Sequence, residues 1–346
     1  MKLRRIIGIF SLVVITAGSI YGYILYRNIF AANTKFNDDQ IAVYIPTGAS
    51  FEDVQKLVAP FIEDMERFNM VAEKKEYPQN IKAGKTIIKN GMNSNDIINA
   101  LRVPVPVKIA FNNQERLQDA MGRIAQQIEP DSVALLRAFT DTKFLEDNGL
   151  TEANVLSICI PNSYEFYWNT TPNKVRDKMV SEYRKFWTPE REAKAKALGL
   201  TPLQVTALAS IVHKETVKPD ERPKVAGVYL NRLNKGMKLQ ADPTVIYSKK
   251  LVDGDFKQVI KRVLNAYLPI DSPYNTYRYD GLPPGPIVTP DVTAIDAVLN
   301  PEKHNYLYFC ASVTNFGYHE FAVTEAQHSV NSAKYHAWVD KMGIKK

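Results

Sequence analysis

The sequence of 346 residues predicts an α+β protein with one membrane-spanning helix, a small domain and a larger mixed domain. Three observations lead to this fold class. An uncharged apolar run lies near the N-terminus, strand and helix patterns follow it, and helical stretches then alternate with short strand-like pieces. Hydrophobic residues at 45% and charged residues at 23% exclude a disordered or fibrous chain. We therefore expect three segments, 1–32, 33–106 and 107–346.

The run from Ile6 to Tyr26 has the composition of a membrane span. At about 1.5 Å per residue it is roughly 31 Å long, which is enough to cross the bilayer core. Lys2, Arg4 and Arg5 precede it, so the positive-inside rule places the N-terminus in the cytoplasm and the remainder outside. A cleaved signal peptide is the alternative, although its apolar core would be shorter and "FAAN" is a weak cleavage site. We expect an uncleaved anchor.

The segment 33–106 predicts a small domain. "IAVYIP" (41–46) alternates like a strand, and "GKTIIKNG" has the pattern of a returning strand. We expect Ser50 to cap a helix between them and Ser94 to cap a last helix after them. This strand–helix–helix–strand unit resembles a LysM-like glycan-binding module. A spacer domain without a ligand is the alternative.

The prolines of "VPVPVKIAF" (103–111) break any continuing helix and mark the start of the larger domain. Strand-like pieces stand at "LSICIP" and "NYLYFCAS" within this domain. The mixture of elements predicts an α+β arrangement. Helical patterns occur at 114–128, 130–140, 172–186, 189–198, 202–217 and 221–235.

The formal net charge of +7 suits an anionic partner, but the basic residues are scattered and no nucleic-acid motif accompanies them. No set of histidines and cysteines has metal-ligand spacing. Cys159 and Cys310 could form one bridge, which their spacing does not decide. We therefore expect no nucleic-acid partner, no metal and no other cofactor.

The helix predicted at 202–217 carries a glutamate on its apolar face. At about 100° per residue from Val205, Glu215 lies at about 280°, inside the apolar arc. His213 lies at about 80°, on the edge of that arc, and Lys214 at about 180° points away. Burial raises the pKa of a carboxyl because it disfavours the charged form. Such a group suits general-acid work on a glycosidic oxygen.

A buried ion pair is the alternative explanation of an inward glutamate. In the next helix, Val225, Val228, Tyr229 and Arg232 share one face, so Arg232 also points inward. The geometry of the two helices leaves the general acid and the ion pair equally open.

Long motifs then resemble a known family. The stretch "ASIVHKETVKPDERPKVAGVYLNRLNKGMKLQADPTVIY" (209–247) resembles the YceG-like family of membrane-anchored endolytic murein transglycosylases. Further matches are "SPYNTYRYDGLPPGPI" (272–287), "IPNSYEFYW" (160–168) and "HEFAVTEAQH" (319–328). The resemblance extends through almost the whole chain, in the order anchor, LysM-like module and catalytic domain.

The resemblance implies non-hydrolytic cleavage of the β-1,4 bond between N-acetylmuramic acid and N-acetylglucosamine. The family motif usually has a glutamate on either side of the lysine, but His213 takes the first place here, so Glu215 matches the catalytic acid. Glu215 would protonate the glycosidic oxygen, and its carboxylate would then accept the proton of the muramic C6 hydroxyl as a 1,6-anhydro ring closes. A standard glycosidase needs two carboxylates. Here the substrate supplies the neighbouring group and the nucleophile, so one is enough.

The resemblance also implies a glycan cleft, where amphipathic rings stack on sugar faces. Structural roles are the alternatives: a helix N-cap for Asp242, an aromatic cluster for Phe166, and loop architecture for the prolines of 281–286. The candidates for substrate binding are Asn162, Tyr164, Glu165, Arg232, Gln240, Asp242, Thr244, Asn275 and Tyr277.

We therefore expect a single-pass protein of the bacterial inner membrane, with a cytoplasmic N-terminus and a periplasmic catalytic domain that cuts nascent glycan strands internally. Peptidoglycan strands are the expected substrate, and peptidoglycan synthases are partners implied by the resemblance. Two alternatives stay open. A hydrolytic muramidase would use Glu215 but admit water, and a non-catalytic scaffold would bind the wall without cutting it.

Overall fold

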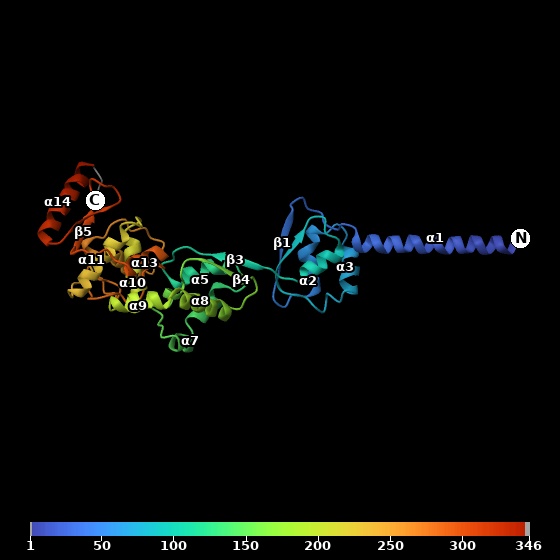
Figure 1. Ribbon diagram of the computed structural model, residues 1–346, viewed down its shortest axis with the longest axis horizontal. Helices are drawn as coiled ribbons and strands as arrows, with labels where there is room; N and C mark the ends of the chain where they lie inside the picture. Colours follow the sequence, from blue (N-terminus) through green and yellow to red (C-terminus); the bar gives the residue numbers. More distant parts are fainter. Residues whose placement is uncertain (1, 343–346) are drawn as a thin grey trace. The chain divides into compact units, whose positions relative to one another are not determined.

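The computed structural model describes residues 2–342 of the chain (Figure 1). The side chains that are not described are those of residues 2–6, 25 and 28. The side chains of the predicted cationic flank, Lys2, Arg4 and Arg5, therefore lie outside the described part. The outermost ends of the first and last predicted segments also lie outside it.

The chain divides into two compact units. Unit 1 runs up to Ile109 and adds the stretches Gln127–Pro130 and Tyr164–Thr170. Unit 2 consists of Ala110–Gln126, Asp131–Ser163 and the chain from Thr171 onward. Two short pieces of the region beyond residue 107 therefore pack with the N-terminal unit, which a reading of consecutive residues does not reveal.

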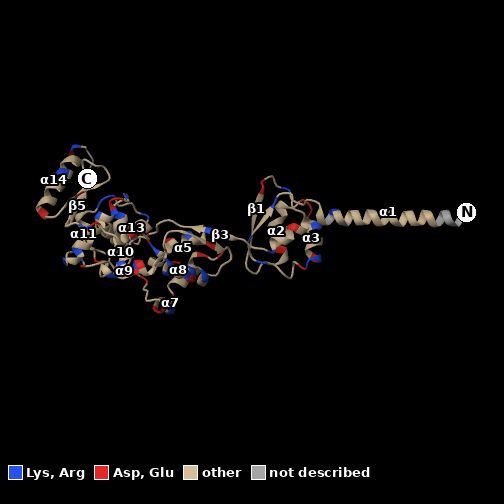
Figure 2. Cartoon of the chain, viewed as in Figure 1, with Lys and Arg blue, Asp and Glu red and all other residues tan. Residues whose placement is uncertain are grey.

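Helix α1 (Lys2–Phe30) is exposed along its described length except at Ile29, which packs against the core of unit 1. Its window Ile7–Ile24 has a mean hydropathy of 1.8, and none of that window is buried. Figure 2 shows no charged residue in the described part of α1 before Arg27. Among the helices of residues 2–342, α1 is the one that is by itself long and apolar enough to cross a bilayer. It is compatible with a single-pass membrane anchor.

Unit 1 contains a two-stranded antiparallel sheet with short helices. The register of β1 and β2 runs from Gln40↔Lys89 to Ile45↔Gly84. Both predicted strands are present, and the predicted pattern omits α3. The elements are β1 (Gln40–Ile45), α2 (Phe51–Val58), a 3₁₀ turn (Ala59–Phe61), α3 (Met65–Lys74), β2 (Gly84–Lys89) and α4 (Ser94–Leu101). The core includes Val54, Phe68, Tyr77, Ile88, Ile97, Ile98 and Leu101.

The two predicted caps of unit 1 have different outcomes. Ser50 caps α2 and forms a reciprocal capping box with Asp53, as predicted. The prediction of Ser94 as a cap is wrong, because Asn93 takes that position and accepts a hydrogen bond from the Asp96 amide at 2.9 Å. Ser94 is already helical and is buried, where its hydroxyl accepts a hydrogen bond from Asn33.

A second two-stranded sheet joins β3 (Pro106–Ala110) and β4 (Ser163–Tyr167). The strand predicted at "LSICIP" is wrong. Residues Val155–Ile158 form a 3₁₀ helix, in which the Ser157 amide donates to the Asn154 carbonyl at 2.8 Å. This apolar run is buried as a turn, because its backbone bonds locally instead of to a neighbouring strand. Cys159 and Cys310 are both free thiols.

Unit 2 is mainly helical and contains the hairpin of β5 (Tyr308–Ala311) and β6 (His319–Ala322), which α14 follows. Figure 1 shows α14 beside β5, and α10 beside α11 and α13. Helix α10 also contacts α12. Helix α10 is buried continuously from Val205 to Val212 and forms the centre of the core. The helices are α5 (Leu117–Ala125), α6 (Ser132–Phe139), α7 (Thr142–Asp147), α8 (Pro172–Phe186), α9 (Pro189–Ala197), α10 (Pro202–Glu215), α11 (Arg222–Asn234), α12 (Asp242–Asp253), α13 (Val292–Leu299) and α14 (Glu325–Lys341).

Candidate active site

Helix α10 presents Glu215 at its C-terminal end. Thr201 caps the helix by accepting from the Gln204 amide, and the Gln204 side chain accepts from the Thr201 amide at 2.9 Å. Thr216 is extended, with φ −138° and ψ 135°, so the helix ends two residues before the predicted limit. Glu215 is therefore the last residue of α10. The buried part of the helix holds its backbone in place, and its side chain is only partly covered.

The Glu215 carboxyl has the properties of a general acid. The Tyr229 hydroxyl of α11 donates a short hydrogen bond to its Oε1. Burial raises the pKa of Glu215 to about 7, although the residue keeps a small exposed surface. The Tyr229 hydrogen bond and the charge of Arg232 lower this pKa, and the charge of Asp242 raises it. Near neutral pH both protonation states are accessible, so the group can donate a proton and take one back.

Tyr229 was not a predicted site residue. It lies three residues before Arg232 on the inward face of α11, and it is 2% exposed. A hydroxyl on an inward face, opposite an inward carboxyl on the preceding helix, was the available signal. The pairing itself depends on how α10 and α11 pack, which helical periodicity does not determine.

Arg232 does not pair with Glu215. Its guanidinium donates to the backbone carbonyls of Leu307 at 2.6 Å and Leu239 at 2.9 Å, and to the Gln240 side chain at 3.2 Å. Among the residues that the structure describes, none forms an ion pair with Glu215. The buried ion pair is therefore not formed, and Arg232 acts on Glu215 only as a nearby charge.

Gln240 lies on the segment between α11 and α12, and Asp242 begins α12. Gln240 has φ +50°, a left-handed conformation that is uncommon for residues other than glycine. Asp242 does not cap α12, because Ala241 takes the cap position and Asp242 is the first helical residue. Its carboxylate accepts instead from the Tyr277 hydroxyl at 2.7 Å. The expected cap role is replaced by a contact with a second candidate.

Thr244 and Asn275 are buried and hold the loop that carries Tyr277. The hydroxyls of Thr244 and Thr276 lie 2.8 Å apart. The Asn275 side chain donates to the Leu268 carbonyl at 2.9 Å and accepts from the Tyr277 amide at 3.0 Å. Both side chains are occupied by contacts within the protein, so in this structure they position neighbouring groups.

The structure joins Arg232 to Gln240, Asp242 to Tyr277, and Thr244 to the loop of Asn275, all within unit 2. Asn162 is exposed and accepts from the Ser163 amide. Tyr164, which is buried, and Glu165, which is exposed, lie on β4 in unit 1.

His213 lies on the flank of α10, as predicted, in a polar cluster. Its Nδ1 is 3.3 Å from the Asp291 carboxylate, which also pairs with Arg222 at 3.2 Å. Burial lowers the pKa of His213 despite the adjacent carboxylate. Lys214 points to the other side and pairs with Glu115 at 2.7 Å. Neither residue contacts Glu215 through a hydrogen bond in the described structure.

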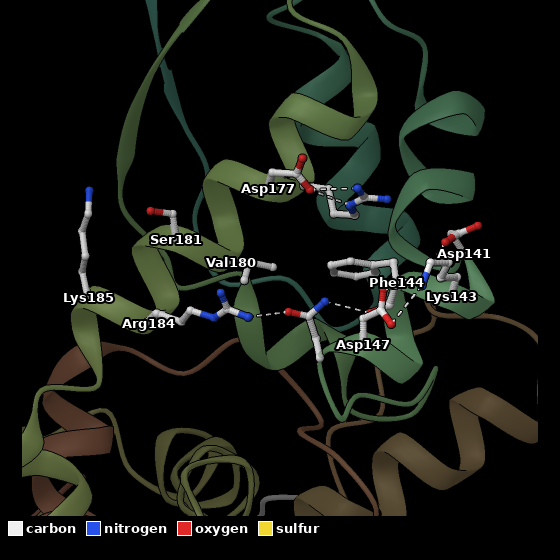
Figure 3. A pocket seen from close by; sticks show the side chains of 11 residues that line it. Asp141, Lys143, Phe144, Asp147, Asp177, Val180, Ser181, Arg184 and Lys185 are labelled. Atoms are coloured by element: carbon white, nitrogen blue, oxygen red, sulfur yellow. Dashed lines mark hydrogen bonds and ion pairs between the residues drawn. The ribbon is translucent and has the colours of Figure 1, made fainter.

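A hollow of about 660 Å³ between α7 and α8 includes none of the residues around Glu215 (Figure 3). Its charged groups pair with one another, as in Lys143–Asp147 at 2.9 Å and Arg176–Asp177 at 2.8 Å. The volume of this hollow therefore does not identify it as the active site. Within residues 2–342, no three His, Cys, Asp or Glu side chains gather as metal ligands would.

The fold and the residues around Glu215 define an α+β protein. Its site has a carboxyl with a pKa of about 7 at the end of a buried helix. Residues 43–334 match the sequence profile of the YceG-like family. The chain belongs to this family.

Named relatives agree with this assignment. The chain is similar to the endolytic murein transglycosylase of Streptococcus pneumoniae serotype 2 (strain D39), with 26% identity over 94% of this chain and 63% of the relative. The enzyme of the same name from Bacillus subtilis (strain 168) shares 41% identity over 38% of this chain and 34% of its own length. A crystal structure of a YceG-like protein from Listeria monocytogenes matches with a TM-score of 0.55 and 25% identity, covering 85% of this chain and 99% of that one. The chain thus spans less than two thirds of the length of the pneumococcal relative.

Proposed function

We propose that the protein is an endolytic peptidoglycan lytic transglycosylase that cleaves the MurNAc-β-1,4-GlcNAc bond and leaves 1,6-anhydro-MurNAc ends. The observation that carries this proposal is Glu215, a carboxyl with a pKa of about 7 at the end of a buried helix and hydrogen-bonded to Tyr229. The similarity to relatives named endolytic murein transglycosylase supports the same activity.

Glu215 carries both proton transfers of the reaction. The protonated carboxyl donates to the glycosidic oxygen as the bond to the muramic C1 breaks and the muramic N-acetyl group stabilises the developing positive charge. The carboxylate then accepts the proton of the muramic C6 hydroxyl, whose oxygen closes the anhydro ring. A pKa near 7 suits this double role, because neither the acid nor the base form is strongly favoured at neutral pH.

Tyr229 positions Glu215, and its hydrogen bond favours the carboxylate that the second step requires. Gln240, Asp242 and Tyr277 are the first proposed sugar-binding groups, because Asp242 and Tyr277 interact electrostatically with Glu215 and Gln240 lies two residues before Asp242. Arg232 positions the side chain of Gln240 by donating a hydrogen bond to it. The remaining proposed substrate contacts are Asn162, Tyr164, Glu165, Thr244 and Asn275, of which the last two also hold the loop of Tyr277.

We further propose that unit 1 contributes the anchor and a LysM-like module. The antiparallel strands β1 and β2 with α2 and α3 between them support the module, and the apolar surface of α1 supports a single-pass helix. The proposed location is the bacterial inner membrane, with a cytoplasmic N-terminus and a periplasmic catalytic domain. There the enzyme would meet glycan strands as membrane-bound peptidoglycan synthases, its proposed partners, extend them.

Mass spectrometry of sacculi digested by the purified full-length protein tests the activity. The proposed transglycosylase produces fragments ending in anhydro-muramic acid, including internal fragments. Fragments with reducing muramic ends only would establish the hydrolytic muramidase instead. Undigested sacculi would support the non-catalytic scaffold.

A further inference from the structure

A group of three aromatic rings, one exposed and two partly buried, lies near the C-terminal end of unit 2. We call Phe316, Tyr335 and Trp338 the aromatic patch. Phe316 belongs to the turn between β5 and β6, and the other two lie on α14. The ring centroids of Phe316 and Trp338 are 5.7 Å apart, and those of Tyr335 and Trp338 are 6.3 Å apart in a stacked arrangement. Segments distant in sequence therefore bring three rings together at the surface.

Phe316 is 67% exposed, which the stability of the fold does not explain. Complete burial of a phenylalanine side chain contributes about 1.5–3 kcal/mol, most of which is unrealised at this position. Exposed single apolar residues are common, but a ring in contact with other aromatic rings forms a continuous apolar surface. Such a surface is typical of a binding site.

The turn that carries Phe316 is held by hydrogen bonds. The Ser312 amide donates to the Tyr318 carbonyl at 2.8 Å, and the Asn315 amide donates to the Ser312 hydroxyl at 3.0 Å. Gly317 has φ +82°, a conformation that a side chain would strain. The ring is therefore presented from an ordered turn, so less conformational entropy is lost when a ligand packs on it.

The same turn contacts the segment that directly follows Glu215. A Cβ atom on Gly317 would lie 3.2 Å from the Lys218 side chain. The Tyr318 hydroxyl donates to Asp220 at 3.0 Å. The turn that carries Phe316 is thus held against the segment that follows Glu215.

We propose that the aromatic patch is an additional glycan subsite, which binds a sugar ring of the same strand by stacking. This inference rests on the proposed function, since the strand is the substrate named there. Tilted aromatic faces within a polar surround match a pyranose, which has an apolar face and polar edges. The ammonium group of Lys218, 5.0 Å from the Tyr318 ring centroid, adds a positive charge that suits the carboxylates of peptidoglycan. A protein partner would require a wider apolar area than three rings provide.

The subsite has a consequence for the choice of substrate. A strand that contacts both the Glu215 region and the aromatic patch must extend beyond the bond that is cleaved. Long strands therefore gain binding free energy that short fragments do not, which favours internal cutting over trimming of ends.

The test uses full-length protein in detergent, carrying Glu215→Gln so that bound strands stay intact. Peptide-free glycan strands, prepared from sacculi with an amidase, are titrated while tryptophan fluorescence is recorded. We expect Phe316→Ala to weaken binding about tenfold, which corresponds to about 1.4 kcal/mol. The matched control is Val330→Ala, an apolar residue of α14 that is 56% exposed and outside the patch, and it should bind unchanged.

The outcomes separate the subsite from the activity. Unchanged binding by Phe316→Ala overturns the subsite, as does a lowered melting temperature without weaker binding, which indicates a structural role of the rings. Binding of intact sacculi but not of peptide-free strands also overturns it, because the ligand would then be the peptide. If the protein with Glu215 restored fails to cut sacculi while Phe316→Ala still weakens binding, the proposed activity fails and the subsite stands.

Discussion

At the scale of single residues, Glu215 derives its chemistry from two opposing influences. Burial raises its pKa to about 7, and the hydrogen bond from Tyr229 opposes that rise. The result is a carboxyl that titrates near neutrality while it is held in one orientation. One residue can then serve as acid and base in turn, provided that Tyr229 remains in contact.

Tyr229→Phe removes the hydrogen bond that favours the carboxylate. We expect the apparent pKa of Glu215 in the pH–rate profile of sacculus digestion to move to higher pH, with a lower maximal rate. Tyr183→Phe, which alters another largely buried tyrosine of unit 2, should leave the profile unchanged. An identical profile for Tyr229→Phe and the wild type would refute the assigned role of Tyr229.

The raised pKa of Glu215 also links stability to pH. The folded state holds this proton more tightly than the unfolded state, whose carboxyl has a pKa of about 4.5. The stabilisation is fully present below about pH 4.5 and is lost as pH rises through about 7. Glu215→Gln should therefore become progressively more stable than the wild type between these pH values, as measured by thermal unfolding in detergent. A constant difference across the range would show that burial does not perturb Glu215.

At the scale of elements, α10 is fixed at the end that carries Glu215. The carboxylate of Asp291 pairs with the buried Arg222 of α11 and lies beside His213 of α10. Arg222 also donates to Thr293 at the start of α13. These contacts join the helices that must keep their register if Tyr229 is to reach Glu215.

Asp291→Asn leaves the buried Arg222 without its anionic partner. We expect a loss of about 1–3 kcal/mol in the free energy of unfolding, since Asp291 itself is partly exposed. Asp147→Asn breaks the exposed pair with Lys143 and should cost less than about 1 kcal/mol. Thermal unfolding of both variants compares the two, and equal losses would contradict the structural role of the Asp291 cluster.

Sequence periodicity predicted which way side chains point from a single helix. It did not predict contacts between residues of different helices. The positions of Glu215, His213 and Lys214 on α10 followed from helical geometry, because a long buried helix keeps its period. Tyr229 was missed, since its partner is on another helix.

The wrong predictions have the same origin. Ser94, the predicted cap, is one residue inside its helix, and Asp242, for which a cap was the alternative role, is also the first helical residue. "LSICIP" has the apolar pattern of a strand, but Val155–Ile158 form a 3₁₀ helix through local hydrogen bonds, which the pattern does not predict.

At the scale of the whole molecule, α1 accounts for the predicted location. Its apolar window is fully exposed, and such a surface is stable in a bilayer but not in water. We propose that this anchor keeps the protein at the membrane while its other parts act on the wall. Removal of residues 1–32 should move the protein from the membrane fraction to the soluble fraction in cell fractionation. Full-length protein with an intact N-terminus by mass spectrometry excludes cleavage, and a truncated protein that stays membrane-bound would contradict the anchor.

We propose that Glu215 performs the cleavage. The most direct measurement is the yield of anhydro-muramic ends from sacculi treated with Glu215→Gln, with His213→Ala as the neighbouring control. We predict that Glu215→Gln loses at least about a hundredfold in rate while its circular dichroism and melting curve stay those of a folded protein. His213→Ala should keep most of the activity. Anhydro ends produced by Glu215→Gln at the wild-type rate would contradict the account.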